Sequence, residues 1–469
     1  MSQTSCLRLE KNVQQMDKAT NPLETLPIWS LIRKYAIPSI ISLLISAIYN
    51  ITDQIFIGKI VGMYGNAATS VTFPLVTLVT AFSVLFGFGG AANFNLSLGS
   101  KKEKDAAKFV GNSISLSVFV GIVIMILTLA SLEPLMKLFG ATENTLTLSV
   151  QYTGVTTIGI PFLVFGTVCS SLIRSDGSPM YSMISSLVGV IINIILNALF
   201  MLVFKWGILG SASATVIGQI ISALFSLYYF KKFKTITMSK DIFNIEFKYV
   251  KQIVSIGNAY FFYQFVMMLS QIVMNNTLNH YGAISSYGSD VPFAVVAVVS
   301  KVSIFISAFL GGIGQSAQPL FGYNYGAKKY DRVKEVYIKA LIACTIISVI
   351  AFIILQIFPR QIISIFGNGS EEYFKFAEKY MRVFMLMIFI SGIQPLSTQL
   401  FTSIGNAKKG IILSLSRQGY FLIPLLLLLP LVFGIDGVLY AGPTSDILAA
   451  ILSLAFAIPE LKKISYINK

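Results

Sequence analysis

Leu98-Gly-Ser-Lys-Lys102 returns later in the chain as Tyr325-Gly-Ala-Lys-Lys329, at an offset of 227 residues between equivalent positions. The same offset, to within one residue, joins four more pairs of glycines: Gly87 with Gly314, Gly177 with Gly405, Gly207 with Gly434, and Gly210 with Gly437. An offset that stays constant along so much of the chain indicates an internal repeat. The sequence therefore predicts two halves with the same fold.

The composition is typical of a membrane protein. Of the 469 residues, 55% are hydrophobic and 12% are charged, and the mean hydropathy is +0.75. Soluble domains carry about 25% charged residues, so this chain has too little charge to cover a water-facing surface. The composition excludes a soluble enzyme and a disordered scaffold. The three cysteines, Cys6, Cys169 and Cys344, lie far apart and indicate neither a metal site nor a disulfide framework.

Twelve apolar runs are long enough to cross a bilayer as helices, which takes roughly 20 residues each. They do not alternate between apolar and polar residues, as transmembrane β-strands do. We therefore predict an all-α polytopic membrane protein with 12 transmembrane helices. The predicted windows are 36–57, 67–93, 109–131, 149–172, 180–204, 208–230, 253–277, 292–318, 335–357, 378–400, 409–430 and 434–458.

The net charge of +15 follows this topology. If both termini are cytoplasmic, 25 of the 35 Lys and Arg residues fall in cytoplasmic segments and 7 fall on the opposite side. Short cytoplasmic loops of membrane proteins carry such an excess of basic residues. The surplus is therefore an orientation signal, and no basic water-facing domain is left to bind nucleic acid. We expect a multi-pass protein of the plasma (inner) membrane with both termini in the cytoplasm.

The repeat predicts how the domains are organised. Each half holds six spans, so both halves enter the membrane from the same side and are related by an axis along the membrane normal. We expect a cytoplasmic N-terminal segment at 1–35, an N-lobe at 36–230, a cytoplasmic linker at 231–252, a C-lobe at 253–458 and a cytoplasmic tail at 459–469. Transporters built in this way carry their substrate between the two repeats.

Several motifs resemble those of multidrug and toxic compound extrusion (MATE) transporters, with the MepA-like bacterial branch as the most similar. They occur at corresponding places in both halves, from about residue 30 to 458. They are the Phe86-Gly-Phe-Gly-Gly-Ala stretch that leads to Lys101-Lys102, its counterpart from Gly312 to Lys329, Arg174-Ser-Asp-Gly-Ser-Pro179, Gly210-Ser-Ala-Ser-Ala-Thr215, and Ser416-Arg-Gln-Gly-Tyr-Phe-Leu-Ile-Pro424.

The resemblance implies two pseudo-symmetric six-helix bundles arranged in a V. It also implies a secondary active multidrug efflux transporter, which exports amphipathic and often cationic organic compounds by alternating access. Export would be coupled to the entry of H⁺ or Na⁺. The expected partners are therefore small-molecule drugs, a coupling cation and the lipid bilayer, and we expect a functional monomer without a cofactor or a resident metal.

Asp53 is the one acidic residue within the predicted N-lobe spans. An ionised carboxylate inside a bilayer costs roughly 3 kcal/mol on insertion scales, so Asp53 should face a cavity or a partner. Asn50 precedes it by three residues and shares its helix face, which makes Asn50 a candidate for the substrate cavity. The alternative is that Asp53 lies at the membrane interface and helps to end the helix.

The resemblance implies that Asp53 occupies the acidic position that MATE transporters use for cation coupling, together with Tyr152, Asn193, Asn197 and Thr215. Asn197 departs from the family pattern, which has Asp there. An amide cannot carry a proton, and hard cations prefer charged oxygens. We therefore expect H⁺ to be favoured over Na⁺ as the coupling ion, with Na⁺ binding at Asp53 as the alternative.

The C-lobe differs from the N-lobe, because the counterpart of Asp53 is Thr277. A polar and sulfur-containing stripe at three- and four-residue spacing is a candidate substrate surface, since Met side chains adapt to varied ligands. The alternative is ordinary helix packing with amides bonding between helices. The candidate substrate-cavity residues of this lobe are Gln264, Met267, Gln271, Asn275 and Lys301.

Three charged residues of the C-lobe are further candidates: Lys301, Arg417 and Asp446. Arg417 lies near the cytoplasmic end of its span, where we expect it to reach the interface by snorkelling. Lys301 and Asp446 lie deeper, and we expect one to neutralise the other, either as a structural pair or with a role in transport.

Two other classes of function are less consistent with the residues. A lipid-linked sugar flippase of the same superfamily should carry several basic residues in its central cavity, and the N-lobe spans have none. A membrane enzyme would need clustered His, Cys or paired carboxylates, and the sequence has no such cluster. We expect a transporter and not an enzyme.

Overall fold

The computed structural model describes the chain except for residues 1–20, 289, 366–369 and 468–469. The first twenty residues of the predicted N-terminal segment and the last two of the predicted tail therefore lie outside the described residues. Within the described part, the regular structure is entirely helical and contains no β-strand.

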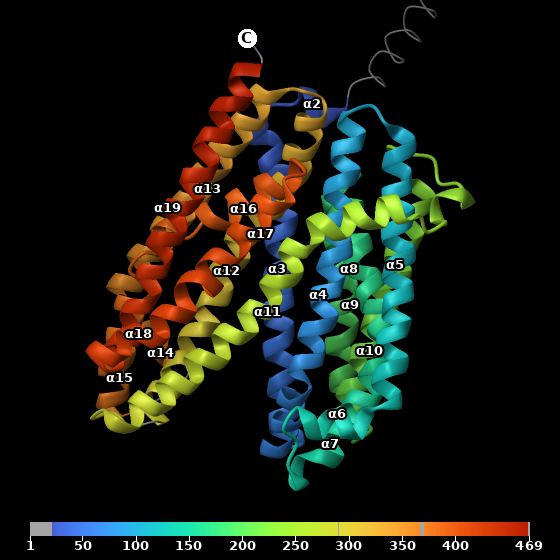
Figure 1. The fold of residues 1–469 in the computed structure, drawn as a ribbon. Coiled ribbons are helices and arrows are strands. Elements are labelled where there is room, and N and C mark those ends of the chain that lie inside the picture. The colour runs from blue at the N-terminus through green and yellow to red at the C-terminus, as the bar shows by residue number, and fades with distance from the viewer. Residues whose placement is uncertain (1–20, 289, 366–369, 468–469) are drawn as a thin grey trace, which may run out of the picture.

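The first half forms an arm around α3 to α10, named the N-lobe below (Figure 1). Its elements are α2 (Pro22–Thr25), α3 (Ile28–Ile60), α4 (Met63–Gly99), α5 (Glu103–Ala130), α6 (Leu132–Leu138), α7 (Glu143–Ile158), α8 (Ile160–Ser175), α9 (Pro179–Ala198), the π-helix η1 (Leu199–Val203) and α10 (Ile208–Tyr229).

The second half forms another arm from α11 to α19, named the C-lobe. The linker contains the 3₁₀ helices η2 (Phe230–Lys232) and η3 (Lys240–Phe243). The C-lobe consists of α11 (Phe247–Ile284), α12 (Asp290–Gly326), α13 (Tyr330–Ile357), α14 (Pro359–Ser364), α15 (Glu371–Phe384), the 3₁₀ helix η4 (Ile388–Ile390), α16 (Ile393–Ser403), α17 (Ala407–Leu415), the π-helix η5 (Ser416–Leu422), α18 (Ile423–Phe433) and α19 (Ile435–Ile467).

Each predicted span falls on one of these helices or on a bent pair. Nine of the described helices are long and apolar enough to cross a membrane, and two bent pairs bring the number to eleven. The pairs are α7 with α8, bent by 49°, and the segment 371–390 with α16, bent by 41°. The twelfth window falls on α19, a helix of 33 residues. The break between α7 and α8 lies at Gly159, and Pro161 stands in the first turn of α8, a position where its missing N–H leaves no bond unmade.

The repeated motif has a local structural cause. Lys101 and Lys328 both adopt left-handed backbone conformations, with φ of 59° and 58°, and so form the same turn after α4 and after α12. The preceding Gly99 and Gly326 lie where those two helices cross. A Cβ on Gly99 would lie 2.0 Å from the carbonyl oxygen of Tyr323, so only glycine permits this approach.

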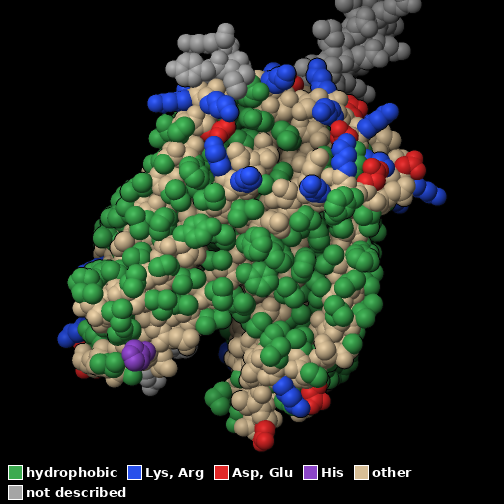
Figure 2. Space-filling view, in the orientation of Figure 1, with side chains coloured by type: hydrophobic (Ala, Val, Ile, Leu, Met, Phe, Trp, Pro, Cys, Tyr) green, Lys and Arg blue, Asp and Glu red, His purple; other side chains and the backbone are tan. Residues whose placement is uncertain are grey.

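The two lobes contact each other at one end of the molecule and separate toward the other. Figure 2 shows the space between them open at the end opposite the chain termini, and Lys and Arg side chains gathered at the terminal end. At the closed end α4 packs on α11 and α3 packs on α12. Gly89 and Gly257 permit the first of these contacts, because a Cβ on Gly89 would lie 2.3 Å from the carbonyl oxygen of Ile253. The open space is called the cleft below.

Two short segments are attached to the closed end by polar contacts. Arg332 donates hydrogen bonds to the carbonyl oxygens of Leu23 (3.1 Å) and Leu26 (2.7 Å) before α3. Lys329 forms an ion pair with Glu24 at 2.7 Å. The chain leading into the N-lobe is therefore held by the α12–α13 turn of the C-lobe.

The linker is attached to the N-lobe through the Asp176 carboxylate, which follows α8. It accepts hydrogen bonds from the Tyr229 hydroxyl (2.7 Å), the Lys234 amide (2.8 Å) and both the amide and the hydroxyl of Thr235 (3.0 and 2.6 Å). Because Asp176 is 1% exposed, each of these donors would lose a buried acceptor if the carboxylate were removed.

Candidate functional site

The Asp53 carboxylate lies inside the N-lobe, where α3 faces α9 and α10. It is 6% exposed. The Asn197 amide donates a hydrogen bond to Asp53 Oδ1 at 2.9 Å, and the Ser211 hydroxyl donates one to the same oxygen at 2.7 Å. Both donors are neutral, and Asp53 forms no ion pair among the residues that the structure describes.

A chain of hydrogen bonds continues from this carboxylate across the lobe. Asn197 also donates to the Asn193 side-chain oxygen at 3.1 Å, and Asn193 donates to the Thr215 hydroxyl at 3.1 Å. Thr215 in turn lies 3.3 Å from the Tyr49 hydroxyl on α3. The chain thus begins and ends on α3, and α9 and α10 supply its middle members.

Helical spacing positions these side chains. Asn193 and Asn197 are one turn apart on α9, and Ser211 and Thr215 are one turn apart on α10, so each pair shares a helix face. The helices come close because of two glycines, Gly189 and Gly218 in α9 and α10. A Cβ on either would lie within 2.8 Å of the other's carbonyl oxygen.

The site is rich in hydrogen-bond acceptors, and no basic side chain of the described residues pairs with its carboxylate. Both hydrogen bonds to Asp53 end on Oδ1, and no described residue donates one to Oδ2. The Asn197 side-chain oxygen is buried without a donor. A buried carboxylate without a countercharge is costly, and a proton or a small cation bound at Asp53 would relieve that cost. This is the chemistry that the cluster can perform.

Not every candidate residue joins this cluster. Tyr152 on α7 lies within electrostatic range of Asp53, but its hydroxyl forms no hydrogen bond with the carboxylate. Asn50 is exposed and donates to the Ser46 carbonyl oxygen of its own helix at 2.8 Å. Asp53 is buried and α3 continues beyond it to Ile60, so the carboxylate does not end the helix.

Ser211 and Tyr49 belong to the cluster and were not among the candidates. The sequence held a signal for both, since Ser211 lies one turn from Thr215 and Tyr49 lies one turn before Asp53. Spacing alone could not select them, because Ser213 and Asn50 stand at similarly close positions.

Comparison with known proteins identifies the family of this chain. The model of the family described as MatE matches residues 38–199 and 259–428, which is more than half of the chain. The chain belongs to the MatE family. The recognition from sequence motifs is therefore confirmed.

Several proteins align with this MATE chain over nearly their whole length. The multidrug export protein MepA of Staphylococcus aureus (strain MSSA476) is 27% identical over 441 residues, which cover 92% of this chain and 94% of MepA. MepA of Staphylococcus saprophyticus is 27% identical over 424 residues, with 90% and 91% coverage.

Solved structures share the fold. An outward-facing multidrug resistance MATE transporter superposes with a TM-score of 0.87 at 19% identity, over 95% of this chain and 97% of its own. A transporter of the same superfamily from Pyrococcus furiosus gives a TM-score of 0.86 at 19% identity, with 95% and 97% coverage. The prediction of a MATE-like all-α membrane fold is confirmed, and its membership of the MatE family makes the chain a transporter.

In the C-lobe of this MATE chain, the predicted stripe lies on α11. Gln271 is exposed and donates to the Asn275 side-chain oxygen at 2.9 Å, and Met267 is 38% exposed. Gln264 is half-buried, and Lys301 is exposed on α12. The structure brings none of these residues to Asp53, and their role in binding substrate stays a prediction.

The C-lobe charges are arranged differently from the expectation. Arg417, which we expected to snorkel, forms an ion pair with Asp446 of α19 through its Nε atom. Asp446 therefore has Arg417 as an ion-pair partner, where we had expected Lys301. This pair could not be predicted from α-helical spacing, because Arg417 lies in η5. The π-helical turn of η5 points the Arg417 side chain in a different direction from that in an α-helix.

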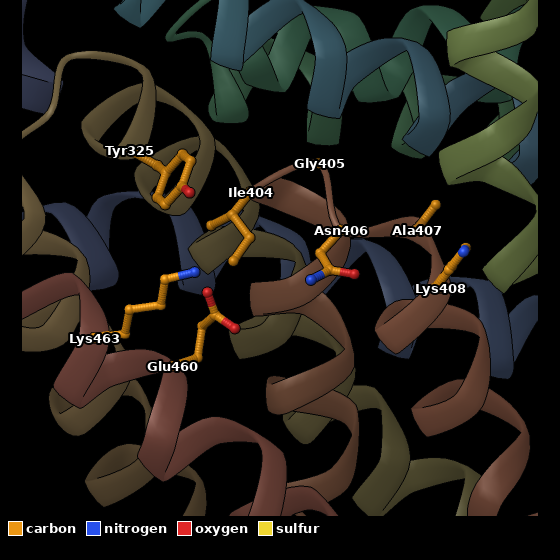
Figure 3. A pocket seen from close by; sticks show the side chains of 8 residues that line it. All are labelled: Tyr325, Ile404, Gly405, Asn406, Ala407, Lys408, Glu460 and Lys463. Carbon is orange, nitrogen blue, oxygen red and sulfur yellow. The ribbon is translucent and has the colours of Figure 1, made fainter.

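A further cavity of about 460 Å³ lies at the terminal end of the C-lobe, lined by Tyr325, Ile404, Gly405, Asn406, Ala407, Lys408, Glu460 and Lys463 (Figure 3). Its Glu460 forms an ion pair with Lys409 at 2.5 Å. This cavity lies on the closed side, remote from Asp53, and is not part of the site described above. Among the described residues, no group of three or more His, Cys, Asp or Glu side chains could hold a metal ion.

Proposed function

We propose that this protein is a multidrug efflux transporter that exports amphipathic, often cationic organic compounds in exchange for protons. The export of drugs is supported by its relatives, which are multidrug export proteins of nearly the same length. The use of protons is supported by one observation, the buried Asp53 carboxylate that receives only neutral donors.

In this mechanism Asp53 is the residue that binds and releases the proton. Asn197 and Ser211 hold its ionised form, and Asn193, Thr215 and Tyr49 link α3 to α9 and α10. Protonation would remove the negative charge that attracts these donors. The contacts between the three helices would then change, which gives proton binding a way to alter the shape of the N-lobe.

The choice of H⁺ over Na⁺ rests on the number of charged oxygens. Sodium sites in proteins favour several oxygen ligands, and hard cations bind best where some of these are charged. Asp53 is the one carboxylate in the cluster, since Asn197 supplies an amide. A single carboxylate is sufficient for a proton, so we favour H⁺, with Na⁺ bound at Asp53 as the other outcome of the test.

The cleft would be the path of the drug. With the termini in the cytoplasm, as the distribution of basic residues favours, the open end of the cleft faces outward and the closed end faces the cytoplasm. The exposed polar residues of α11, with Asn50 and Lys301, would then contact the substrate. The protein would work as a monomer in the plasma membrane, because each lobe supplies one side of the cleft.

A transport assay in proteoliposomes tests the proposal. The full-length protein is reconstituted, and uptake of a fluorescent organic cation is measured under a proton gradient or a sodium gradient imposed separately. We expect the proton gradient to drive transport and Asp53→Asn to abolish it, while Glu143→Gln, which changes an exposed acid on α7, leaves it unchanged. Transport driven by sodium alone would refute proton coupling, and unchanged transport by Asp53→Asn would remove Asp53 from the mechanism.

A further inference from the structure

The C-lobe contains a second buried charge site that the proton mechanism does not use. Arg417 is ten residues after the start of α17 at Ala407, which is about 15 Å along a helix axis. Asp446 is eleven residues after the start of α19 at the opposite side, or about 16 Å. The pair therefore lies near the middle of a bilayer whose core is about 30 Å thick.

The two members of this pair are exposed to different degrees. The Asp446 side chain is 4% exposed, whereas the Arg417 side chain is 29% exposed. Their contact uses Nε of the guanidinium and Oδ1 of the carboxylate. Among the described residues, no acceptor receives a hydrogen bond from the two terminal nitrogens of Arg417, Nη1 and Nη2. These two nitrogens are therefore available to another ligand.

We infer that the exposed part of the Arg417 side chain faces water rather than lipid. A guanidinium turned toward lipid at this depth would cost roughly 3 kcal/mol or more. The neighbouring residue Gln418 instead accepts a hydrogen bond from Ser270 of α11 at 3.0 Å, and Tyr263 of α11 lies within electrostatic range of Arg417. Arg417 is thus beside α11, the helix that carries the half-buried Gln264 and the exposed Gln271.

Asp446 holds the Arg417 guanidinium in an orientation suited to binding an anion. It fixes the guanidinium through Nε, and the π-helical turn of η5 aims the side chain toward α19. An arginine held in this way presents its two terminal nitrogens in the planar geometry that matches a carboxylate or a phosphate. The buried Asp446 also offsets the cost of keeping the cation inside the membrane when no ligand is bound.

We propose that Arg417 is an anion-binding residue of the transport cleft, positioned by Asp446, and that it binds the carboxylate of zwitterionic or anionic amphiphilic substrates. This inference rests on the proposed function, because it assumes that organic compounds enter the cleft. Asp53 in the N-lobe and Arg417 in the C-lobe then give the two lobes opposite polarity. The protein would accept molecules with a carboxylate in addition to simple cations.

A matched pair of dyes tests this site. The probes are a rhodamine ethyl ester, which is a cation, and the same rhodamine as its free carboxylic acid, which is a zwitterion. Binding to the full-length protein in nanodiscs is measured by fluorescence anisotropy. In the double variant Arg417→Gln/Asp446→Asn, we expect the affinity for the acid to fall about tenfold, the effect of losing hydrogen bonds to a charged group, and the affinity for the ester to stay unchanged.

The double variant removes both charges without leaving either one buried and alone, so it should fold, and its melting temperature is measured alongside. Arg417→Lys is the second variant, because it keeps the positive charge and loses the planar geometry. We expect it to weaken binding of the acid and to spare the ester. If the double variant does not fold, Arg417→Lys alone decides the matter.

The outcomes separate the two proposals. Equal binding of the acid by the wild type and by the folded variants would overturn the role of Arg417, as would equal losses for both dyes. If the wild type binds the ester and transports it, the proposed efflux function stands whatever the result with the acid. If the wild type binds neither dye, the efflux function and this inference fall together.

Discussion

A single methyl group added at Gly99 should shift the conformational equilibrium away from the conformation that is closed at the terminal end. Gly99 and Gly326 lie at the crossing of α4 and α12, where the lobes contact each other through their backbones. A Cβ on Gly99 would lie 2.0 Å from the Tyr323 carbonyl oxygen and 2.9 Å from the Ala327 nitrogen. Ordinary contacts of a Cβ begin near 3.4 Å, so the helices in Gly99→Ala must separate by about 1 Å or more.

The energetic cost follows from the rigidity of the two backbones. Overpacking of this kind costs about 1–3 kcal/mol, and neither backbone atom, the Tyr323 oxygen or the Ala327 nitrogen, can rotate away as a side chain would. The penalty applies only to the conformation in which α4 and α12 are in contact. The ratio between the conformation closed at the terminal end and one open there should therefore fall by about 5-fold to 150-fold.

Distances between spin labels measure this shift. In a cysteine-free background, one pair of labels at Met63 and Ile284 spans the mouth of the cleft, where both side chains are more than 70% exposed. A second pair at Lys104 and Lys408 spans the terminal end. In Gly99→Ala we expect shorter distances at the mouth and longer distances at the terminal end, together with a loss of drug export.

The control is Gly314→Ala on α12, where an added Cβ meets no atom within 4 Å. Alanine favours helix over glycine by up to about 1 kcal/mol, so this variant should be neutral or slightly stabilised and should keep the wild-type distances. Our reasoning would be refuted if Gly99→Ala folded normally with unchanged distances, or if Gly314→Ala shifted them as much.

Three further predictions concern other parts of the molecule. Asn197→Asp places a second carboxylate next to Asp53, and because charged oxygens favour hard cations, sodium-driven transport should appear in proteoliposomes in which the wild type shows none. The Lys329 ammonium, hydrogen-bonded to Glu24, holds the pKa of that carboxyl below its usual value. The pair therefore stabilises the fold above about pH 4.5, and this stabilisation disappears at lower pH. At pH 7 the melting temperature of Glu24→Gln should lie slightly below that of the wild type, as for a surface pair of about 0.2–1 kcal/mol. The difference should vanish on acidification. Asp176→Ala leaves four donors without their acceptor, at about 1–3 kcal/mol for each donor that stays buried. Trypsin should therefore cleave the linker of this variant at trypsin concentrations that leave Glu143→Gln intact.

The helices could be predicted from the sequence because membrane helices need long apolar runs, and such runs are visible without a fold. The repeat was visible for a related reason. Gly207 and Gly434 have the same φ of 57°, and Gly177 and Gly405 the same φ of 83°. These left-handed conformations are costly for other residues, so the same glycines mark the same turns in both halves.

The candidate site could be predicted only in part. Asp53 is conspicuous because an acid inside a bilayer needs a reason, and the two asparagines of α9 are spaced for convergence. Ser211 was missed because its contact with Asp53 depends on how α10 is rotated against α3, which no local pattern encodes. Arg417 was misplaced for a similar reason, since a π-helical turn is not visible in the spacing of apolar residues.

The difference between the lobes has a consequence for energy coupling. Thr277 stands in the C-lobe at the position that corresponds to Asp53 and is 7% exposed. A threonine hydroxyl does not titrate as a carboxyl group does, so this position cannot take up a proton. Asp446, the buried acid paired with Arg417, could bind a proton only by giving up that partner, and breaking a buried ion pair costs about 3–5 kcal/mol. Asp53 has no ion-pair partner among the residues that the structure describes. We infer that the repeated scaffold assigns protons to the N-lobe, where binding opposes no internal cation, and leaves the C-lobe pair as a fixed polar feature of the cleft.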